Sequence, residues 1–354
     1  MQKRKPSLFG RLSLLSSLLA LGVIVLGAYV RLSDAGLGCP DWPGCYGKIF
    51  APTQHHAIQE ANTAFPERPV EVAKAWKEMV HRYLASSLGV LIILLNILAW
   101  RKKGESSVPS PVLTFALLIL VCFQGALGMW TVTLLLKPAV VTLHLLMGLT
   151  TLSVLWWITL KSIPMLPFRG EGVGYGVRLW AACGLGVLAC QIFLGGWTST
   201  NYVALHCFDF PTCQGKWWPD MDFHEAFRIW REVGMNYEGG VLSNEAGVAI
   251  HLSHRIGALL TLTILGALSI HVLFRVKDLA SKAAASCLLV LLFLQVSLGV
   301  LNVVLVLPTA IAVAHNGVAA LIVLSLLTLN YALNYSADKK AIAEVNSRHL
   351  AVTS

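Results

Sequence analysis

The most constraining feature of this chain is a series of long segments that contain no charged residue. About 20 residues of α-helix cross the hydrocarbon core of a bilayer, so an uncharged apolar run of that length is a candidate membrane span. Seven such runs cover residues 12–30, 83–100, 106–136, 138–160, 179–208, 256–274 and 283–337. The last run is too long for one helix, and Pro308 near its middle breaks the helical hydrogen-bond ladder. The sequence therefore predicts an all-α integral membrane protein with eight transmembrane helices.

Composition and charge agree with this class of protein and disfavour others. Only 13% of the residues are charged, against about 25% in a soluble domain, so a soluble globular enzyme is not expected. The net charge of +9 does not indicate nucleic-acid binding, because most lysines and arginines fall in connections on one side of the predicted spans. The positive-inside rule then places both termini in the cytoplasm. We expect the chain to cross a bacterial inner membrane and to contact its lipid.

Two predicted outer loops carry the same motif, 168 residues apart. Residues 39–48 and 207–216 both follow Cys-x-Asp-aromatic-Pro-x-Cys-x-Gly-Lys. Later features keep nearly that offset, with His81-Arg82 against His254-Arg255 and Gln124 against Gln295. Such self-similarity indicates a tandem duplication, here of a four-helix bundle. The predicted parts are an N-terminal half at 1–161, a Pro- and Gly-rich cytoplasmic linker at 162–177, a C-terminal half at 178–337 and a cytoplasmic tail at 338–354.

Four histidines lie near the outer ends of the even-numbered spans, two in each half. They are His81, His144, His254 and His315. At about 1.5 Å of rise per residue, all four fall within the outer third of the membrane. Ionisable side chains within spans are costly and usually mark a functional interior. Metal ligation, a proton path and a buried structural histidine are the alternatives.

Among metals, the pattern favours haem iron. Zinc needs three or four protein ligands, often cysteines, and no cysteine inside the spans repeats between the halves. The four cysteines within the spans, Cys122, Cys183, Cys190 and Cys287, are interpreted as buried small residues. Two histidines that face each other across a four-helix bundle suit a haem with two axial imidazoles.

The residue one helical turn before the first histidine differs between the halves. Glu78 stands three residues before His81, whereas His251 stands three residues before His254. This spacing puts each on the same helical face as its histidine. A carboxylate is not needed for electron transfer alone, so we expect the N-terminal pocket to do chemistry and the C-terminal pocket to hold a resident cofactor.

Two further patterns each allow two interpretations. Arg82 and Arg255 are placed where they would pair with haem propionates, or extend to the membrane surface. Leu-Gly recurs near the outer end of every odd span, at 26–27, 127–128, 194–195 and 298–299, in three cases with a glutamine three residues before the leucine. The glycines indicate either close helix packing or clearance for a flat cofactor.

The paired cysteines of the outer loops have a spacing that allows a disulfide within each loop. Cys39 and Cys45, like Cys207 and Cys213, are six residues apart with a proline between them. Extracytoplasmic disulfides are mostly structural, so we expect a loop staple. A redox-active pair that exchanges electrons with a thiol protein stays open.

Taken together, these motifs resemble the haem A synthase family. The resemblance covers residues 12–335 and rests on the two Cys pairs, Glu78-x-x-His81-Arg82, His144, His251-x-x-His254-Arg255 and His315. It implies oxidation of the C8 methyl group of haem O to a formyl group, through an alcohol and a geminal diol. It also implies that His254 and His315 bind a resident haem b, that His81 and His144 receive the substrate haem, and that Glu78 is the catalytic carboxylate.

The resemblance further implies the partners of the chain. These are haem O, the haem O synthase that supplies it, and an electron acceptor that is a quinone or a thiol protein. A homo-oligomer is compatible with this scheme. The main alternative is a di-haem cytochrome b that passes electrons between a quinol and an outer partner, with no chemistry on haem.

Overall fold

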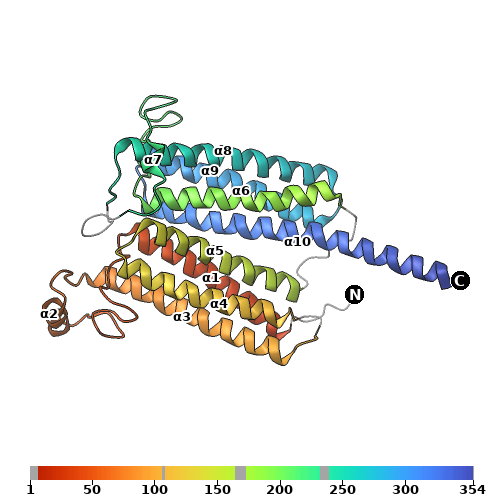
Figure 1. Cartoon of the computed structure of the whole chain (residues 1–354), viewed down its shortest axis with the longest axis horizontal. Coiled ribbons are helices and arrows are strands. Elements are labelled where there is room, and N and C mark those ends of the chain that lie inside the picture. The colour runs from red at the N-terminus through yellow and green to blue at the C-terminus, as the bar shows by residue number, and fades with distance from the viewer. Residues whose placement is uncertain (1–6, 106–107, 164–172, 232–238, 354) are drawn as a thin grey trace.

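The computed structural model describes residues 7–105, 108–163, 173–231 and 239–353, the last 18 of these as backbone only, and it is helical throughout its named elements (Figure 1). The helices are α1 (Leu8–Leu32), α2 (His55–Ala64), α3 (Val72–Arg101), α4 (Pro111–Thr133), α5 (Pro138–Ser162), α6 (Tyr175–Thr200), α7 (Phe223–Ala226), α8 (Asn244–Arg275), α9 (Leu279–Val304) and α10 (Thr309–Thr353). Eight of the described helices are long and apolar enough to span a membrane, with α10 doing so over Thr309–Tyr335. The predicted class, an all-α protein with eight membrane-spanning helices, is confirmed.

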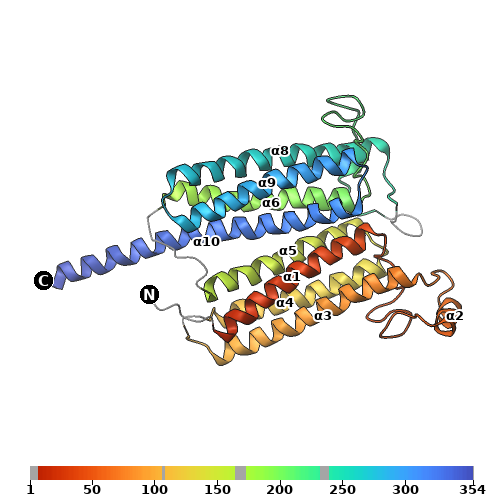
Figure 2. The ribbon, with the colours of Figure 1, turned by 180° about the vertical axis from the view of Figure 1, so that it is seen from behind.

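The eight spanning helices of the described chain form two sets of four by their contacts. The two sets lie side by side in both views (Figures 1 and 2). In the first set, α1 and α4 each contact α3 and α5, so the four helices close a ring. In the second set, α6 and α9 each contact α8 and α10. The rings meet where α10 contacts α1 and α5 and where α5 contacts α6. We call these sets the first ring and the second ring.

The connections are divided between the two ends of the rings. The segments that carry α2 and α7 lie at one end, opposite the end at which α1 begins and α10 finishes (Figure 1). We call the former, formed by the described residues of 33–71 and 201–243, the loop end. The division of the chain into duplicated halves stays a prediction. Residues 164–172 of the predicted linker lie outside the described residues, and α10 continues through the predicted tail to Thr353.

Helices α3 and α8 begin about three turns before the uncharged runs at 83 and 256 that predicted them. A charged residue ends a hydropathy run, but it does not end a helix when its charge is paired. Glu78 and Arg82 form an ion pair four residues apart on α3, which is the spacing at which helical side chains meet. His81 and His254 therefore lie well inside their helices instead of opening them.

Each ring has its own apolar core, built from side chains three or four residues apart along the helices. The first core includes Leu88, Ile92, Leu95, Ala99, Leu152, Leu155 and Ile158. The second includes Leu265, Leu268, Val272, Ile322, Leu326, Leu329 and Leu333. This spacing keeps one stripe of each helix towards its neighbours.

The four cysteines within the spans do not join these cores. Cys122, Cys183, Cys190 and Cys287 are all exposed, so the expectation that they are buried was wrong. Lipid is as apolar as the protein interior, so a small apolar residue in a membrane-spanning helix does not mark the buried face.

Both predicted disulfides are formed. The Cα atoms of Cys39 and Cys45 are 4.9 Å apart, and those of Cys207 and Cys213 are 4.5 Å apart. We call residues 38–48 the first disulfide loop and 206–216 the second disulfide loop. Each loop lies against the helix that carries the first histidine of its ring, α3 or α8.

The residue before each loop's first cysteine sets how closely the loop approaches its helix. A Cβ at Gly38 would lie 2.6 Å from the carbonyl carbon of Lys74, so only glycine lets the first loop approach α3 this closely. In the second loop this place is taken by His206, and the glycine is on the helix instead. A Cβ at Gly247 of α8 would lie 2.1 Å from the His206 ring. The glycine of this contact is therefore on the loop in the first case and on the helix in the second.

Replacing Gly38 by alanine should loosen the first disulfide loop. The added methyl group would meet backbone atoms of α3, which cannot rotate away, and overpacking of this kind costs about 1–3 kcal/mol. Thermal unfolding in detergent, and the rate at which a thiol reductant opens the Cys39–Cys45 disulfide, measure the change. Gly247→Ala should have a smaller effect, because the His206 ring can turn aside.

Gly22→Ala is the control for this prediction, because no atom lies within 4 Å of a Cβ placed there. A Gly38→Ala protein that unfolds and is reduced like Gly22→Ala would show that the loop does not depend on this contact.

Candidate functional site

The four predicted histidines form two pairs, each across the diagonal of a ring. His81 is on α3 and His144 on α5, which are not in contact with each other but share α1 and α4 as neighbours. His254 on α8 and His315 on α10 have the same relation in the second ring. Each four-helix ring thus holds two imidazoles that face its interior from opposite helices.

Each of these imidazoles lies against a glycine of a neighbouring helix. In the first ring, a Cβ at Gly27 would lie 2.9 Å from Cε1 of His81, and one at Gly128 would lie 3.4 Å from Cε1 of His144. In the second ring, a Cβ at Gly195 would lie 3.0 Å from Cε1 of His254, and one at Gly299 would lie 3.2 Å from Cε1 of His315. Each glycine stands five residues before the last residue of its helix. The four contacts therefore share one depth, about 7.5 Å from the loop-end termini of those helices. The Leu-Gly repeat provides space for the histidine rings themselves, which neither interpretation from sequence had included.

The histidine pairs fit haem, because three of their four Nδ1 atoms lack partners within the protein. The Nδ1 atoms of His81, His144 and His315 are buried without a hydrogen bond, an uncommon condition for buried polar atoms. No group of three or more His, Cys, Asp or Glu among the described residues could hold a bare metal ion. A metal bound by one pair must bring its other ligands with it. Haem does so, since its porphyrin supplies four nitrogens and leaves two axial positions for imidazoles.

Glu78 and His251 occupy equivalent places beneath the two disulfide loops. Each is only 4% exposed. A carboxylate oxygen of Glu78 accepts a hydrogen bond from the backbone N–H of Cys39 at 2.9 Å, and Nδ1 of His251 accepts one from that of Cys207 at 3.1 Å. The carboxylate and the imidazole therefore hold the two loops in the same way, while giving the two sites different chemistry.

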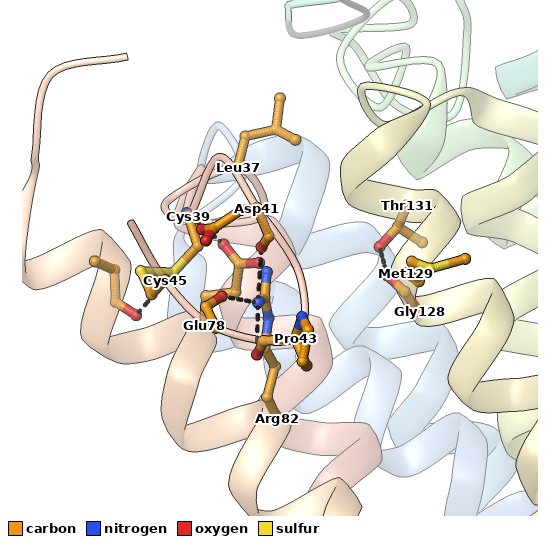
Figure 3. Close-up of polar contacts among 12 residues, drawn as sticks. Leu37, Cys39, Asp41, Pro43, Cys45, Glu78, Arg82, Gly128, Met129 and Thr131 are labelled. Atoms are coloured by element: carbon orange, nitrogen blue, oxygen red, sulfur yellow. Dashed lines mark hydrogen bonds and ion pairs between the residues drawn. A yellow bond between two sulfur atoms is a disulfide. The ribbon is translucent and has the colours of Figure 1, made fainter. Parts of the chain in front are cut away.

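The two arginines next to the first histidine of each ring also hold the loops. Arg82 pairs with Glu78 and donates hydrogen bonds of 2.6–3.3 Å to three carbonyl oxygens of residues 41–44 (Figure 3). Arg255 donates bonds of 2.7–2.8 Å to three carbonyl oxygens of residues 207–212. Both guanidinium groups thus donate hydrogen bonds to backbone carbonyl oxygens of the loops. Their contact with haem propionates stays a prediction.

An aspartate closes each disulfide loop, a role that the sequence motif contained but did not reveal. Asp41 accepts hydrogen bonds of 2.7 Å from the backbone N–H groups of residues 46–47, and Asp209 accepts bonds of 2.6 and 2.9 Å from those of 214–215. The Thr212 hydroxyl and these N–H groups lower the pKa of Asp209 to about 2. The second loop therefore keeps its anionic acceptor at any physiological pH.

Comparison with known proteins agrees with this site. The family model COX15-CtaA, described as a cytochrome oxidase assembly protein, matches residues 10–327. The chain is 45% identical over 324 residues to a haem A synthase of Shewanella oneidensis, covering 91% of this chain and 95% of that protein. It is 26% identical over 323 residues to a haem A synthase of Caulobacter vibrioides, covering 85% and 88%. With that of Granulibacter bethesdensis it shares 24% identity over 348 residues, covering 92% and 87%. The chain therefore belongs to the COX15-CtaA family of cytochrome oxidase assembly proteins, together with these haem A synthases.

Proposed function

We propose that this chain is an oxidoreductase that converts haem O to haem A. The C8 methyl group would be oxidised to an alcohol and then to a geminal diol, which loses water to give the formyl group. With water as the source of oxygen, each oxidation would release two electrons to the acceptor and two protons. The observation that carries the proposal is the arrangement of four imidazoles, paired across two rings at one depth, in a chain of the haem A synthase family. Each pair offers a haem two axial ligands on a rigid scaffold.

The two rings are assigned different haems. His254 and His315 would hold a resident haem b, and His81 and His144 would receive haem O. The difference beneath the disulfide loops supports this assignment, since Glu78 adjoins the first pair and His251 the second. Bound in the second ring, haem b would supply one-electron redox chemistry that passes electrons towards a quinone or a thiol protein.

Glu78 is the residue assigned to proton transfer. Each oxidation of the methyl carbon releases protons, and a positioned carboxylate can accept them. One oxygen of Glu78 pairs with Arg82 and the other accepts the Cys39 N–H, so the group is fixed one helical turn from His81.

The setting proposed for this activity is a bacterial inner membrane with both termini in the cytoplasm. The lysines and arginines support this orientation. It places the two disulfides outside, in an oxidising compartment where such bonds persist. Haem O carries a long apolar chain, so we propose delivery through the membrane by contact with a haem O synthase. A homo-oligomer would be compatible with this setting.

The conversion is tested in cells that make haem O but lack any other enzyme able to oxidise it. Expression of this chain should cause haem A to accumulate, as measured by mass spectrometry of extracted haems. A di-haem electron carrier would leave haem O unchanged, and that outcome would refute the proposed activity.

Replacing His254 or His315 by alanine should remove haem b from the purified protein, because the variant loses one of the two imidazoles that would bind the iron. The pyridine haemochrome of the isolated protein measures this content directly. His224→Ala is the control, since His224 is exposed at the loop end. Full haem b content in either alanine variant would reject the second ring as the haem b site.

Replacing Glu78 by histidine should abolish haem A formation while sparing both haem b and the first disulfide loop. An imidazole at this place copies the contact that His251 makes with Cys207, so the loop keeps its acceptor. Loss of a general base lowers rates by about 10²–10⁴, and haem O should accumulate. Glu71→Gln, an exposed carboxylate at the start of α3, is the control. Normal haem A yield with Glu78→His would leave Glu78 with a structural role alone.

A further inference from the structure

Three of the four helices that place a glycine against a histidine also place a glutamine one turn earlier. Gln124 precedes Gly128 on α4, Gln191 precedes Gly195 on α6, and Gln295 precedes Gly299 on α9. Residues four apart lie on the same face of a helix. The glutamine and the glycine of each helix therefore face the same histidine.

Each glutamine is bonded to the histidine that its glycine contacts. Nε2 of Gln191 lies 3.0 Å from Nδ1 of His254 and also donates to the His254 carbonyl oxygen at 3.1 Å. Nε2 of Gln295 lies 3.1 Å from Nε2 of His315. In the first ring, Nε2 of Gln124 donates to the carbonyl oxygen of His144 at 2.9 Å.

The oxygen atom of each side-chain amide is available to accept a hydrogen bond. The Oε1 atoms of Gln124, Gln191 and Gln295 are buried without a hydrogen-bond partner. A histidine that binds a metal through one ring nitrogen presents an N–H on the other, and that N–H almost always donates to an oxygen. A side-chain amide carries both a donor and an acceptor, so it can bond the imidazole before and after iron binds.

Helix α1 lacks this element. Val23 stands four residues before Gly27, at the place of the glutamine. The His81 ring faces the backbone of Val23, as the rings of His144 and His315 face the backbones of Gln124 and Gln295, so only the side chain at this place distinguishes α1. Of the four imidazoles, His81 is the one whose facing helix offers a glycine but no amide.

We propose that Gln124, Gln191 and Gln295 are positioning residues for His144, His254 and His315, and that Val23 leaves His81 as the weakly held ligand. In the second ring an amide then lies against the imidazole of each ligand, whereas in the first ring the single amide, that of Gln124, holds His144 through its backbone carbonyl oxygen. This difference lets haem in the first ring exchange while haem in the second ring stays. The inference rests on the proposed function, in which a substrate haem must enter and a product haem must leave beside a resident haem b.

The first test installs the missing amide. Purified full-length protein that holds haem b is loaded with haem O, and the transfer of each haem to excess apomyoglobin is followed by mass spectrometry. The wild-type protein should lose haem O fast and haem b slowly. Val23→Gln should slow haem O release about tenfold or more, the size of effect expected for a second-shell partner of a metal-bound histidine.

Two variants control for size and for the helix itself. Val23→Met has a side chain of similar length to glutamine without the amide, and should release haem O at the wild-type rate. Leu18→Gln adds an amide to α1 at an outward-facing residue that is 56% exposed, and should also release haem O normally. Slowing of release by either control, or its absence in Val23→Gln, would overturn the role assigned to residue 23.

The second test removes an amide from the second ring. Gln191→Met should speed haem b release about ten- to a hundredfold and shift its midpoint potential and its electron paramagnetic resonance signal, whereas Cys190→Ala, at an exposed neighbour, should not. Unchanged release and spectra in Gln191→Met, with normal haem content, would overturn this inference alone. A wild-type protein purified without haem would instead overturn the proposed function.

Discussion

The contact between a histidine ring and a glycine of the adjacent helix determines how the rest of this molecule can be arranged. In a bilayer, backbone polar groups must be satisfied within helices, so room for a ring comes from removing a side chain and not from opening the backbone. Gly27, Gly128, Gly195 and Gly299 provide that room at the same distance from their helix ends. This common distance fixes the depth of both candidate haem sites. The disulfide loops are anchored through Glu78 and His251, one helical turn from His81 and His254.

The two loops keep one geometry with different residues. In the first, Gly38 meets the backbone of α3, and in the second the His206 ring meets Gly247 of α8. The acceptor for the cysteine N–H is a carboxylate in one and an imidazole in the other. Both sets of residues therefore hold a loop over a histidine pair. What differs is the group left beside the pair, and the proposed division between a reacting haem and a resident haem depends on that difference.

The sequence was sufficient to predict the spans and the disulfides, because lipid imposes long apolar runs and because a repeated motif makes spacing informative. The same repeat located the four histidines, whose role as haem ligands stays a prediction. The sequence placed the starts of α3 and α8 too late, because Arg82 and Arg255 end the hydropathy runs. Each is nevertheless accommodated within its helix, Arg82 by its ion pair with Glu78 and Arg255 by its bonds to loop carbonyl oxygens. It could not assign the Leu-Gly repeat, because spacing within one helix does not say which neighbour that helix faces. For the same reason it left the glutamines without a role and missed the engagement of Arg82 and Arg255 with loop carbonyls.

The proposed use of two haem sites requires a fixed distance between them. Polar contacts between the two four-helix rings hold them together at two depths in the membrane. Towards the loop end, the guanidinium of Arg31 on α1 donates to the Ser199 carbonyl oxygen of α6 at 2.8 Å and lies over the Tyr202 ring. Nearer the opposite end, the indole N–H of Trp156 on α5 donates to the Thr328 hydroxyl of α10 at 2.9 Å. In a bilayer, where apolar packing does not distinguish a neighbouring helix from lipid, such hydrogen bonds set which faces of two bundles meet. Under the proposed function, these bonds would keep the two histidine pairs in a fixed register while each pair binds its own haem.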